Sequence, residues 1–418
     1  MKPWLLFIFG FLSLSPLFNF LGIFDRGATW VALCVLPLLP FVLVGNIKLN
    51  QFFCLFTSLV FALGGVTAIY WGEPRYFYYS IFVISSFFLF SVLSNEEKSY
   101  LVDVSSNFLM ILVIGAWVGF FLAQSGVEPV WSFPRSISGG QEIYFYYTTI
   151  TNFVRGDFIR PAGIYDEPGT LSMVICCVAA VRHMMQKSSR YTWALLGLGF
   201  VTFSLAHLIY VILHAASEKI KIRGVILAFA IVLMILPILN SSGLFKKYQS
   251  NLLNRLSVTA EGDLKGDNRS FRFYNALEYI QSDNHVFWFG LDPVIAYPIG
   301  YSYRSFKPVG ENPLFPLVAT GILVSLPYYL FLAISFISVL NGRRYLVFFG
   351  IGLLFIQRPY VMSLGYSVLA VMVLMTAVFD FKTRPGFVRD FFTLILSRKQ
   401  EPTEEKMASI NYVDKVTK

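Results

Sequence analysis

Long apolar stretches recur along almost the whole chain, and they restrict its fold more than any other feature. They cover roughly residues 3–24, 29–45, 52–70, 77–94, 105–125, 170–186, 191–217, 224–240, 313–340, 345–357 and 361–380. Of the 418 residues only 14% are charged, whereas soluble domains carry about 25%. Because so few polar side chains are available to cover a surface in water, the sequence predicts an all-α, polytopic membrane protein.

The basic residues between the apolar runs predict the topology. The run 191–217 has basic residues on both flanks, which belong on one side of the membrane under the positive-inside rule. We therefore expect it to cross twice, as two short helices that turn at Thr202–Ser204. The first run, after Lys2, has no small-residue cleavage site and is expected to remain as a helix. The prediction is about 12 transmembrane helices with both termini in the cytoplasm.

This topology divides the chain into a transmembrane domain, residues 1–380, and a basic cytoplasmic tail, residues 381–418. Much of the net charge of +9 marks the cytoplasmic side and favours contact with anionic lipid, so nucleic acid is not an expected partner. Two long connections, 126–168 and 241–312, face the outside. They are rich in Tyr, Phe, Trp, Gly and Arg, which predicts ordered segments that carry the chemistry.

The sequence predicts no metal site and no cofactor. The four cysteines lie inside apolar runs, without the spacing of a metal site or a disulfide framework. His207 and His214 would be about 10 Å of helical rise apart, too far to bind one metal ion together. They and His183 are expected to be structural. Matching pairs of Gly/Pro-broken helices, the usual sign of a secondary transporter, do not occur in the sequence.

The first long connection ends in the sequence RPAGIYDEPG, residues 160–169, directly before an apolar run. Pro168 suits the first position of the next helix. Asp166 and Glu167 either cap that helix or take part in a site. Arg160 opposes the helix dipole and is expected to need an anion, either Glu167 or a ligand phosphate. Arg155 is a second cation in the same connection.

The second long connection contains GDNRSFRFYNALEYIQ, residues 266–281, which predicts a short helix with Phe271, Tyr274 and Leu277 on its apolar stripe. Arg269 and Arg272 share a face on its first turn, where two cations favour a bound anion. The alternative is that they reach for lipid headgroups or nearby aspartates. Glu311 is either an interfacial helix cap or a catalytic carboxylate. The external His285 either titrates in a site or is polar surface.

The order of these elements resembles a known family. An R-x-x-G-x-x-x-E-P-G element enters a span, and a later span contains T-x-S. The large second connection carries R-x-x-R-x-x-x-A-L and an aromatic-Phe-Gly segment, and it closes with E-N before a helix bearing T-G-I. Over roughly residues 140–370 the chain is similar to the bacterial Wzy-type O-antigen and capsule polymerases and the related O-antigen ligases.

The resemblance implies a metal-independent membrane glycosyltransferase of GT-C-like fold that acts at the periplasmic face of the bacterial inner membrane. Donor and acceptor would be glycans linked to undecaprenyl diphosphate, and a chain-length regulator is a further candidate partner. Arg160, Arg269 and Arg272 match family arginines that hold the diphosphate, with Arg155 as a fourth candidate. Gly163, Glu167 and Pro168 match the first motif. The candidates for the catalytic base are Glu311, Glu167 and His285.

Two departures favour a polymerase over a ligase. The ligases resemble one another in a T-x-S-R element, whereas this chain reads TFSLAH, and they carry a His-Asn pair where this chain has Glu311–Asn312. Ligation of finished glycan to the lipid A core remains an alternative function. A flippase or other transporter of lipid-linked oligosaccharide is a second alternative, disfavoured because the spans hold few ionisable groups.

Overall fold

The computed structural model of the chain describes residues 2–17, 51–134, 142–155, 158–218, 270–292, 309–310, 312–359 and 363–378. The described residues are mostly helical (76%), in agreement with the predicted all-α class. Among them two helical segments, Asn95–Gln124 and Phe315–Asn341, are long and apolar enough to cross a membrane, and several shorter apolar helices accompany them. The number of crossings and the side on which each terminus lies stay predictions.

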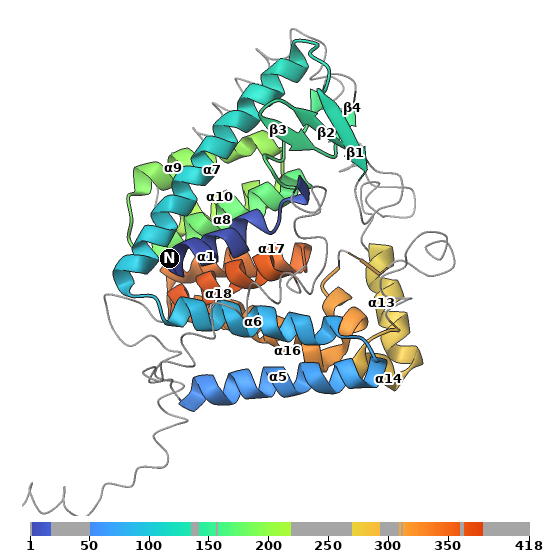
Figure 1. Ribbon diagram of the computed structural model, residues 1–418. Helices are drawn as coiled ribbons and strands as arrows, with labels where there is room; N and C mark the ends of the chain where they lie inside the picture. Colours follow the sequence, from blue (N-terminus) through green and yellow to red (C-terminus); the bar gives the residue numbers. More distant parts are fainter. Residues whose placement is uncertain are drawn as a thin grey trace, which may run out of the picture.

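The helices pack side by side in one bundle (Figure 1). Helix α18 lies against α6 and α8, α5 lies against α6 and α16, α10 against α17, and α1 against α7. The bounds are α1 Lys2–Phe7, the π-helix η1 Ile8–Leu12, α5 Gln51–Trp71, α6 Arg75–Ser91, α7 Asn95–Gln124, α8 Pro168–Met184, α10 Leu205–Ser217, α16 Phe315–Ile337, α17 Leu346–Gln357 and α18 Leu364–Val378.

Helix α8 forms the centre of the bundle. It contacts α7, α9 (Ser189–Leu198), α10, α17 and α18. Every residue of α8 except His183 is buried. This burial explains the composition of the helix, which is made of apolar and small side chains with no charge before Arg182. Both ends of α8 carry polar clusters, around Glu167 and around His183.

The run 191–217 forms a helical hairpin. Helix α9 leads into the 3-10 helix η2 (Gly199–Thr202), and Phe203 then adopts a left-handed conformation with φ of 48° before α10 begins. The hydroxyl of Ser189, at the start of α9, donates to the carboxylate of Glu218, just after α10, so the two helices are antiparallel. The predicted turn at Thr202–Ser204 is confirmed. The predicted double crossing stays a prediction. Helix α10 has 13 residues, which is about 20 Å of helix, whereas the hydrocarbon core of a bilayer is about 30 Å thick.

The described parts of the first long connection, residues 126–134, 142–155 and 158–168, contain strands that the sequence did not predict. Three antiparallel strands form one sheet and two short strands form a hairpin. Trp131 pairs with Phe145, and Phe145 pairs in turn with Ile150. The bounds are β1 Trp131–Pro134, β2 Glu142–Tyr146, β3 Thr149–Thr151, β4 Val154–Arg155 and β5 Phe158–Ile159.

The described part of the second long connection consists of two helices, α13 (Ser270–Ser282) and α14 (Asn284–Phe289). In Figure 1 these helices and the strands of the first connection both lie on the side of the bundle away from the N-terminus. The two segments that the sequence analysis expects to carry the chemistry therefore lie on one side of the molecule.

Candidate functional site

The acidic end of RPAGIYDEPG forms a buried ion pair at the start of α8. Glu167 is the N-cap residue in extended conformation and Pro168 is the first helical residue, as predicted, but the Glu167 side chain does not cap the helix. Its Oε2 lies 2.6 Å from Nη1 of Arg358, which follows α17, and the two side chains are only 12% and 14% exposed. The capping interpretation of Glu167 is therefore wrong at the side chain, because a cation from another helix binds the carboxylate.

Gly169 makes room for this pair. A Cβ atom at that position would lie 2.5 Å from Cζ and 2.6 Å from Nε of Arg358. The guanidinium thus rests directly on the first turn of α8. Beside it, Oδ1 of Asp166 accepts a hydrogen bond of 3.2 Å from Thr170. The sequence Asp-Glu-Pro-Gly thus holds Arg358 in place, because Glu167 pairs with its charge and Gly169 has no side chain to push it away.

Arg160 lies after the β4–β5 hairpin and reaches the turn of the α9–α10 hairpin. Its Nε and Nη2 donate to the backbone oxygens of Thr202 and Phe203 at 3.2 and 3.1 Å, and its guanidinium lies over the ring of Phe153. The sequence analysis expected an anion there. The structure adds backbone carbonyls at the carboxyl end of η2, where the partial negative charge of a helix attracts a cation.

Gly163 shapes the same segment. Its φ of 65° is in the left-handed region. Its N–H donates to the Thr149 hydroxyl and its carbonyl accepts from the Ile150 N–H at 2.7 Å, both in strand β3. A residue with a side chain would be strained in this conformation. The glycine of R-x-x-G-x-x-x-E-P-G therefore docks the segment onto the sheet, between Arg160 and Glu167. Arg155 lies in the β4 strand, paired with Phe158.

The second connection places Arg272 on the first turn of α13, as predicted. Its Nη1 donates to the Gly310 carbonyl at 3.2 Å, and Asn312 Nδ2 donates to the Arg272 carbonyl at 3.3 Å. Asn312 Oδ1 also accepts from the Leu314 N–H at 2.8 Å, in the turn that leads into α16. Arg269 and Glu311 lie outside the described residues, directly beside Ser270 and Asn312.

The apolar stripe predicted for α13 is only in part the face that packs, because Leu277 alone of its three residues is half-buried. Phe271 and Tyr274 are 46% and 67% exposed, whereas Ala276 is fully buried. The helix packs through Ala276, Tyr279 and Ile280 against α14 and α16. Phe271 and Tyr274 are consequently left on the surface near Arg272, and Phe273 is also 37% exposed.

The aromatic-Phe-Gly and T-G-I motifs contact each other. Gly290, which ends α14, and Gly321, inside α16, have φ values of 81° and 70° in the left-handed region. A Cβ at Gly290 would lie 2.6 Å from the Thr320 nitrogen, and one at Gly321 would overlap the Trp288 carbonyl. The N–H of Leu291 donates to the carbonyl of Val318 at 2.7 Å. Helix α16 is therefore broken at Gly321, and α14 is docked against the break by backbone contact.

His285 lies in α14, where the carboxylate of Asp283 caps the helix. Its Nδ1 is 2.8 Å from the hydroxyl of Tyr70, and the ring of Tyr70 stacks on Phe289. The indole N–H of Trp71 donates to the Phe289 carbonyl at 2.9 Å. The end of α5 thus fixes α14, and with it the orientation of His285.

The structure therefore groups the predicted residues into two clusters. One joins Arg160, Gly163 and Glu167 to the start of α8, and the other joins Arg272, Asn312 and His285 to the broken helix α16. Arg358 was not predicted as a site residue. No local pattern indicates it, because its partners Glu167 and Gly169 lie far away along the chain.

Comparison with known proteins adds no further assignment. The chain matches no protein-family model, no curated protein and no solved structure.

Proposed function

We propose that the chain is a membrane glycosyltransferase that joins undecaprenyl-diphosphate-linked oligosaccharide repeat units into O-antigen or capsular polysaccharide, at the periplasmic face of a bacterial inner membrane. The observation that carries this proposal is the construction of the R-x-x-G-x-x-x-E-P-G element. Arg160, Gly163, Glu167 and Gly169 each make a contact that depends on the residue type at that position. Such a specific arrangement at the mouth of a buried helix is typical of a preorganised polar site.

The reaction needs positive charge more than it needs acid catalysis. The acceptor hydroxyl oxygen attacks the anomeric carbon of the donor, and the bond from that carbon to the diphosphate oxygen breaks. The diphosphate leaves with the electron pair, and the hydroxyl proton passes to a base. We assign Arg160, Arg272, Arg269 and Arg155 to the developing charge on the diphosphate. Removal of one preorganised donor in comparable electrostatic sites costs about 2.7–4 kcal/mol of transition-state stabilisation.

Because Glu167 pairs with Arg358, we propose that it is a positioning residue. Its Oε2 is 2.6 Å from Nη1 of Arg358, so this oxygen orients a cation rather than facing an acceptor sugar. We therefore assign the base to Glu311, with His285 as the second candidate. A correctly positioned base contributes about 10²–10⁴-fold to the rate. We add Arg358 to the cations that are proposed to bind the lipid diphosphate.

The test uses a deletion strain complemented with Arg160→Gln or Arg272→Gln. The banding pattern of the lipopolysaccharide or capsule is read on gels, and the amount of protein in the membrane is measured by immunoblot. We expect both variants to insert at the normal level and to lose long-chain glycan, while single repeat units persist on lipid A. A normal ladder from both variants would remove this assignment.

The matched control is Arg75→Gln. Arg75 is an arginine at the start of α6 that pairs with Glu73, and its side chain is 35% exposed. Its variant should give a normal ladder. The deletion strain also distinguishes the alternatives, because loss of a ligase leaves no repeat unit on lipid A, whereas loss of a polymerase leaves one.

A further inference from the structure

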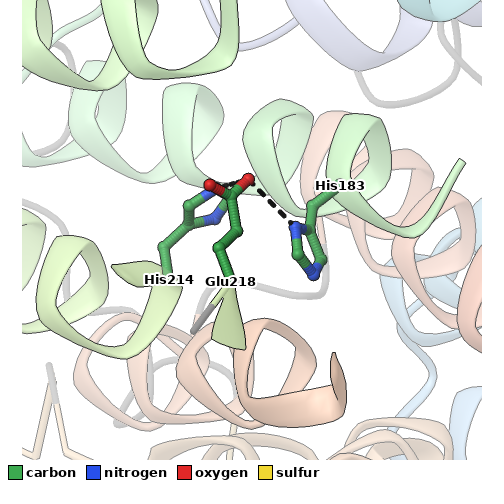
Figure 2. A group of neighbouring side chains, drawn as sticks. All are labelled: His183, His214 and Glu218. Atoms are coloured by element: carbon green, nitrogen blue, oxygen red, sulfur yellow. Dashed lines mark hydrogen bonds and ion pairs between the residues drawn. The ribbon is translucent and has the colours of Figure 1, made fainter. Parts of the chain in front are cut away.

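A cluster of two histidines and a glutamate lies at the other end of α8. His183 comes about 24 Å of helical rise after Glu167, and it meets His214 and Glu218 from the end of α10 (Figure 2). Oε1 of Glu218 is 3.4 Å from Nδ1 of His183 and 3.6 Å from Nε2 of His214. One potential ligand atom from each residue lies within 4.8 Å of the other two.

These spacings are close to those of a metal centre. With metal–ligand distances of about 2.0–2.1 Å, the ligand atoms of a tetrahedral zinc site stand about 3.3 Å apart. Two of the separations are already 3.4 and 3.6 Å. Only a small movement of the two imidazole rings, whose centroids are 5.1 Å apart, is needed to close the third.

The hydrogen bonds around His183 turn a lone pair toward the carboxylate. The hydroxyl of Ser217 donates its one hydrogen to the His214 carbonyl at 2.6 Å, so it accepts from His183 Nε2 at 3.3 Å. In a neutral imidazole with its proton on Nε2, Nδ1 carries a lone pair. This lone pair faces Oε1 of Glu218 at 3.4 Å. Two acceptors that face each other at this distance need a proton or a metal cation between them.

His214 provides the second, independent observation. Its side chain is fully buried, and its Nε2 has no hydrogen-bond partner among the described residues. Its other nitrogen, Nδ1, is 3.4 Å from the hydroxyl of Tyr210, which is itself fully buried. A metal-bound histidine usually donates its other ring N–H to a hydrogen-bond acceptor, and the Tyr210 hydroxyl is placed to be that acceptor for Nδ1.

Glu218 is held in the same way. Its Oε2 accepts from the Trp193 indole at 2.7 Å and from the Ser189 hydroxyl at 2.9 Å. These two donors fix the orientation of the carboxylate, and its Oε1 faces both histidines.

We propose that His183 Nδ1, His214 Nε2 and Glu218 Oε1 bind a divalent transition-metal cation, for which Zn²⁺ is the matching ion. Two imidazoles and one carboxylate form an established ligand set for zinc, with the fourth position open to water. His183 and Glu218 are 12% and 16% exposed, which leaves room for that water. The cation would tie the end of α8 to the α9–α10 hairpin.

The surrounding charges are compatible with this ion. Among the described residues, Arg343 and Arg344 donate beside the cluster to the backbone carbonyls of Ala216 and Met184. Their charge is thus partly neutralised beside the cluster by helix ends. The proposed ion lies at the end of α8 opposite Glu167, so the proposal does not rest on the glycosyltransferase function and assigns the ion no part in that reaction.

The test measures the metal directly. The full chain, carrying an affinity tag without histidine, is purified in detergent, stripped with a chelator and titrated with Zn²⁺, and the bound metal is counted by mass spectrometry. We expect about one Zn²⁺ per chain. Co²⁺ in place of Zn²⁺ should give the intense visible absorption of a tetrahedral site. Glu218→Gln and His214→Ala should each weaken binding at least about tenfold.

Two further variants separate ligation from folding. Tyr210→Phe keeps all three ligands and removes the hydroxyl that orients His214, so it should weaken Zn²⁺ binding by about 10–100-fold. His285→Ala, which removes a histidine on α14, should leave the zinc content unchanged. Absence of stoichiometric Zn²⁺ from the monodisperse wild-type protein would overturn the proposal, and so would retention of the ion by Glu218→Gln or its loss from His285→Ala.

Discussion

The contact between Gly169 and Arg358 allows one substitution to test how the start of α8 is built. Alanine at position 169 places a Cβ 2.5 Å from Cζ of Arg358. Both residues lie in a buried environment, so the guanidinium must move away from Glu167. Gly169→Ala should therefore break the ion pair although it changes neither charged residue.

The expected magnitude follows from two opposing effects. Breaking a buried ion pair costs at least about 3 kcal/mol, because one charge is left without its partner. Neither side chain of this pair is more than 14% exposed, so solvent screens it little. Alanine also stabilises a helical position relative to glycine by about 0.5–1 kcal/mol. The net effect of Gly169→Ala is a loss of about 2 kcal/mol in the free energy of unfolding.

The sign should reverse once Arg358 is absent. In an Arg358→Ala background no guanidinium occupies the space, so only the helix-propensity gain of about 0.5–1 kcal/mol remains. The four proteins of this double-mutant cycle are unfolded in mixed micelles of increasing SDS fraction and followed by tryptophan fluorescence. The coupling energy between positions 169 and 358 should be about 3 kcal/mol.

The matched control is Gly197→Ala in α9, where a built Cβ meets nothing within 4 Å. It should be neutral or slightly stabilising. An equal loss of stability from Gly169→Ala with and without Arg358 would show that the helix backbone, not the guanidinium, requires glycine. Gly169 would then not be needed to make room for Arg358 beside Glu167.

The remaining predictions concern the broken helix and the helical hairpin. Gly321→Ala should lower the free energy of unfolding by about 1–3 kcal/mol from backbone strain alone, and by more because the new Cβ overlaps the Trp288 carbonyl. The same SDS titration measures this loss. The control is Gly65→Ala, because a Cβ at that position meets nothing within 4 Å. A Gly321→Ala variant as stable as the wild type would contradict the observed φ of 70°. Trp117→Phe removes the indole N–H that donates to the Leu198 carbonyl at 2.9 Å and should cost about 0.5–1.5 kcal/mol, whereas no change in the unfolding midpoint would show that water replaces this donor.

The local features of the fold could be predicted because they depend on residues close in sequence. Proline has a fixed φ and no N–H, so Pro168 marked the start of α8. Equal charge on both flanks of run 191–217 predicted the turn at Thr202–Ser204, which the structure confirms at Phe203. Mean hydropathy and run length predicted the helical content.

The strands of the first connection were not predictable in the same way. Each described strand has five residues or fewer, too short for an alternating pattern to stand out from a loop rich in aromatic residues. The side-chain partners were harder still. Arg160 offered a choice between a carboxylate and a phosphate, and its observed contacts are backbone carbonyls of a distant turn.

The glycines of the W-F-G and T-G-I motifs show most clearly which features depend on the tertiary structure. The letters W-F-G and T-G-I indicated two glycines in the right order, but only the folded chain shows Gly290 and Gly321 in backbone contact. In the cluster of His183, His214 and Glu218, the last two share a helical face at a spacing of four residues, which can be read from the sequence. His183 comes from a different helix, so only the folded chain shows that it joins them.

The amino-acid order by itself determined which segments leave water, where α8 begins and where the run 191–217 turns, because hydropathy, proline geometry and charge act within a few residues. The tertiary structure alone decided which cation meets Glu167 and which histidine meets Glu218. Those pairings depend on how helices pack around α8, and packing is set by the shapes of many side chains far apart along the chain.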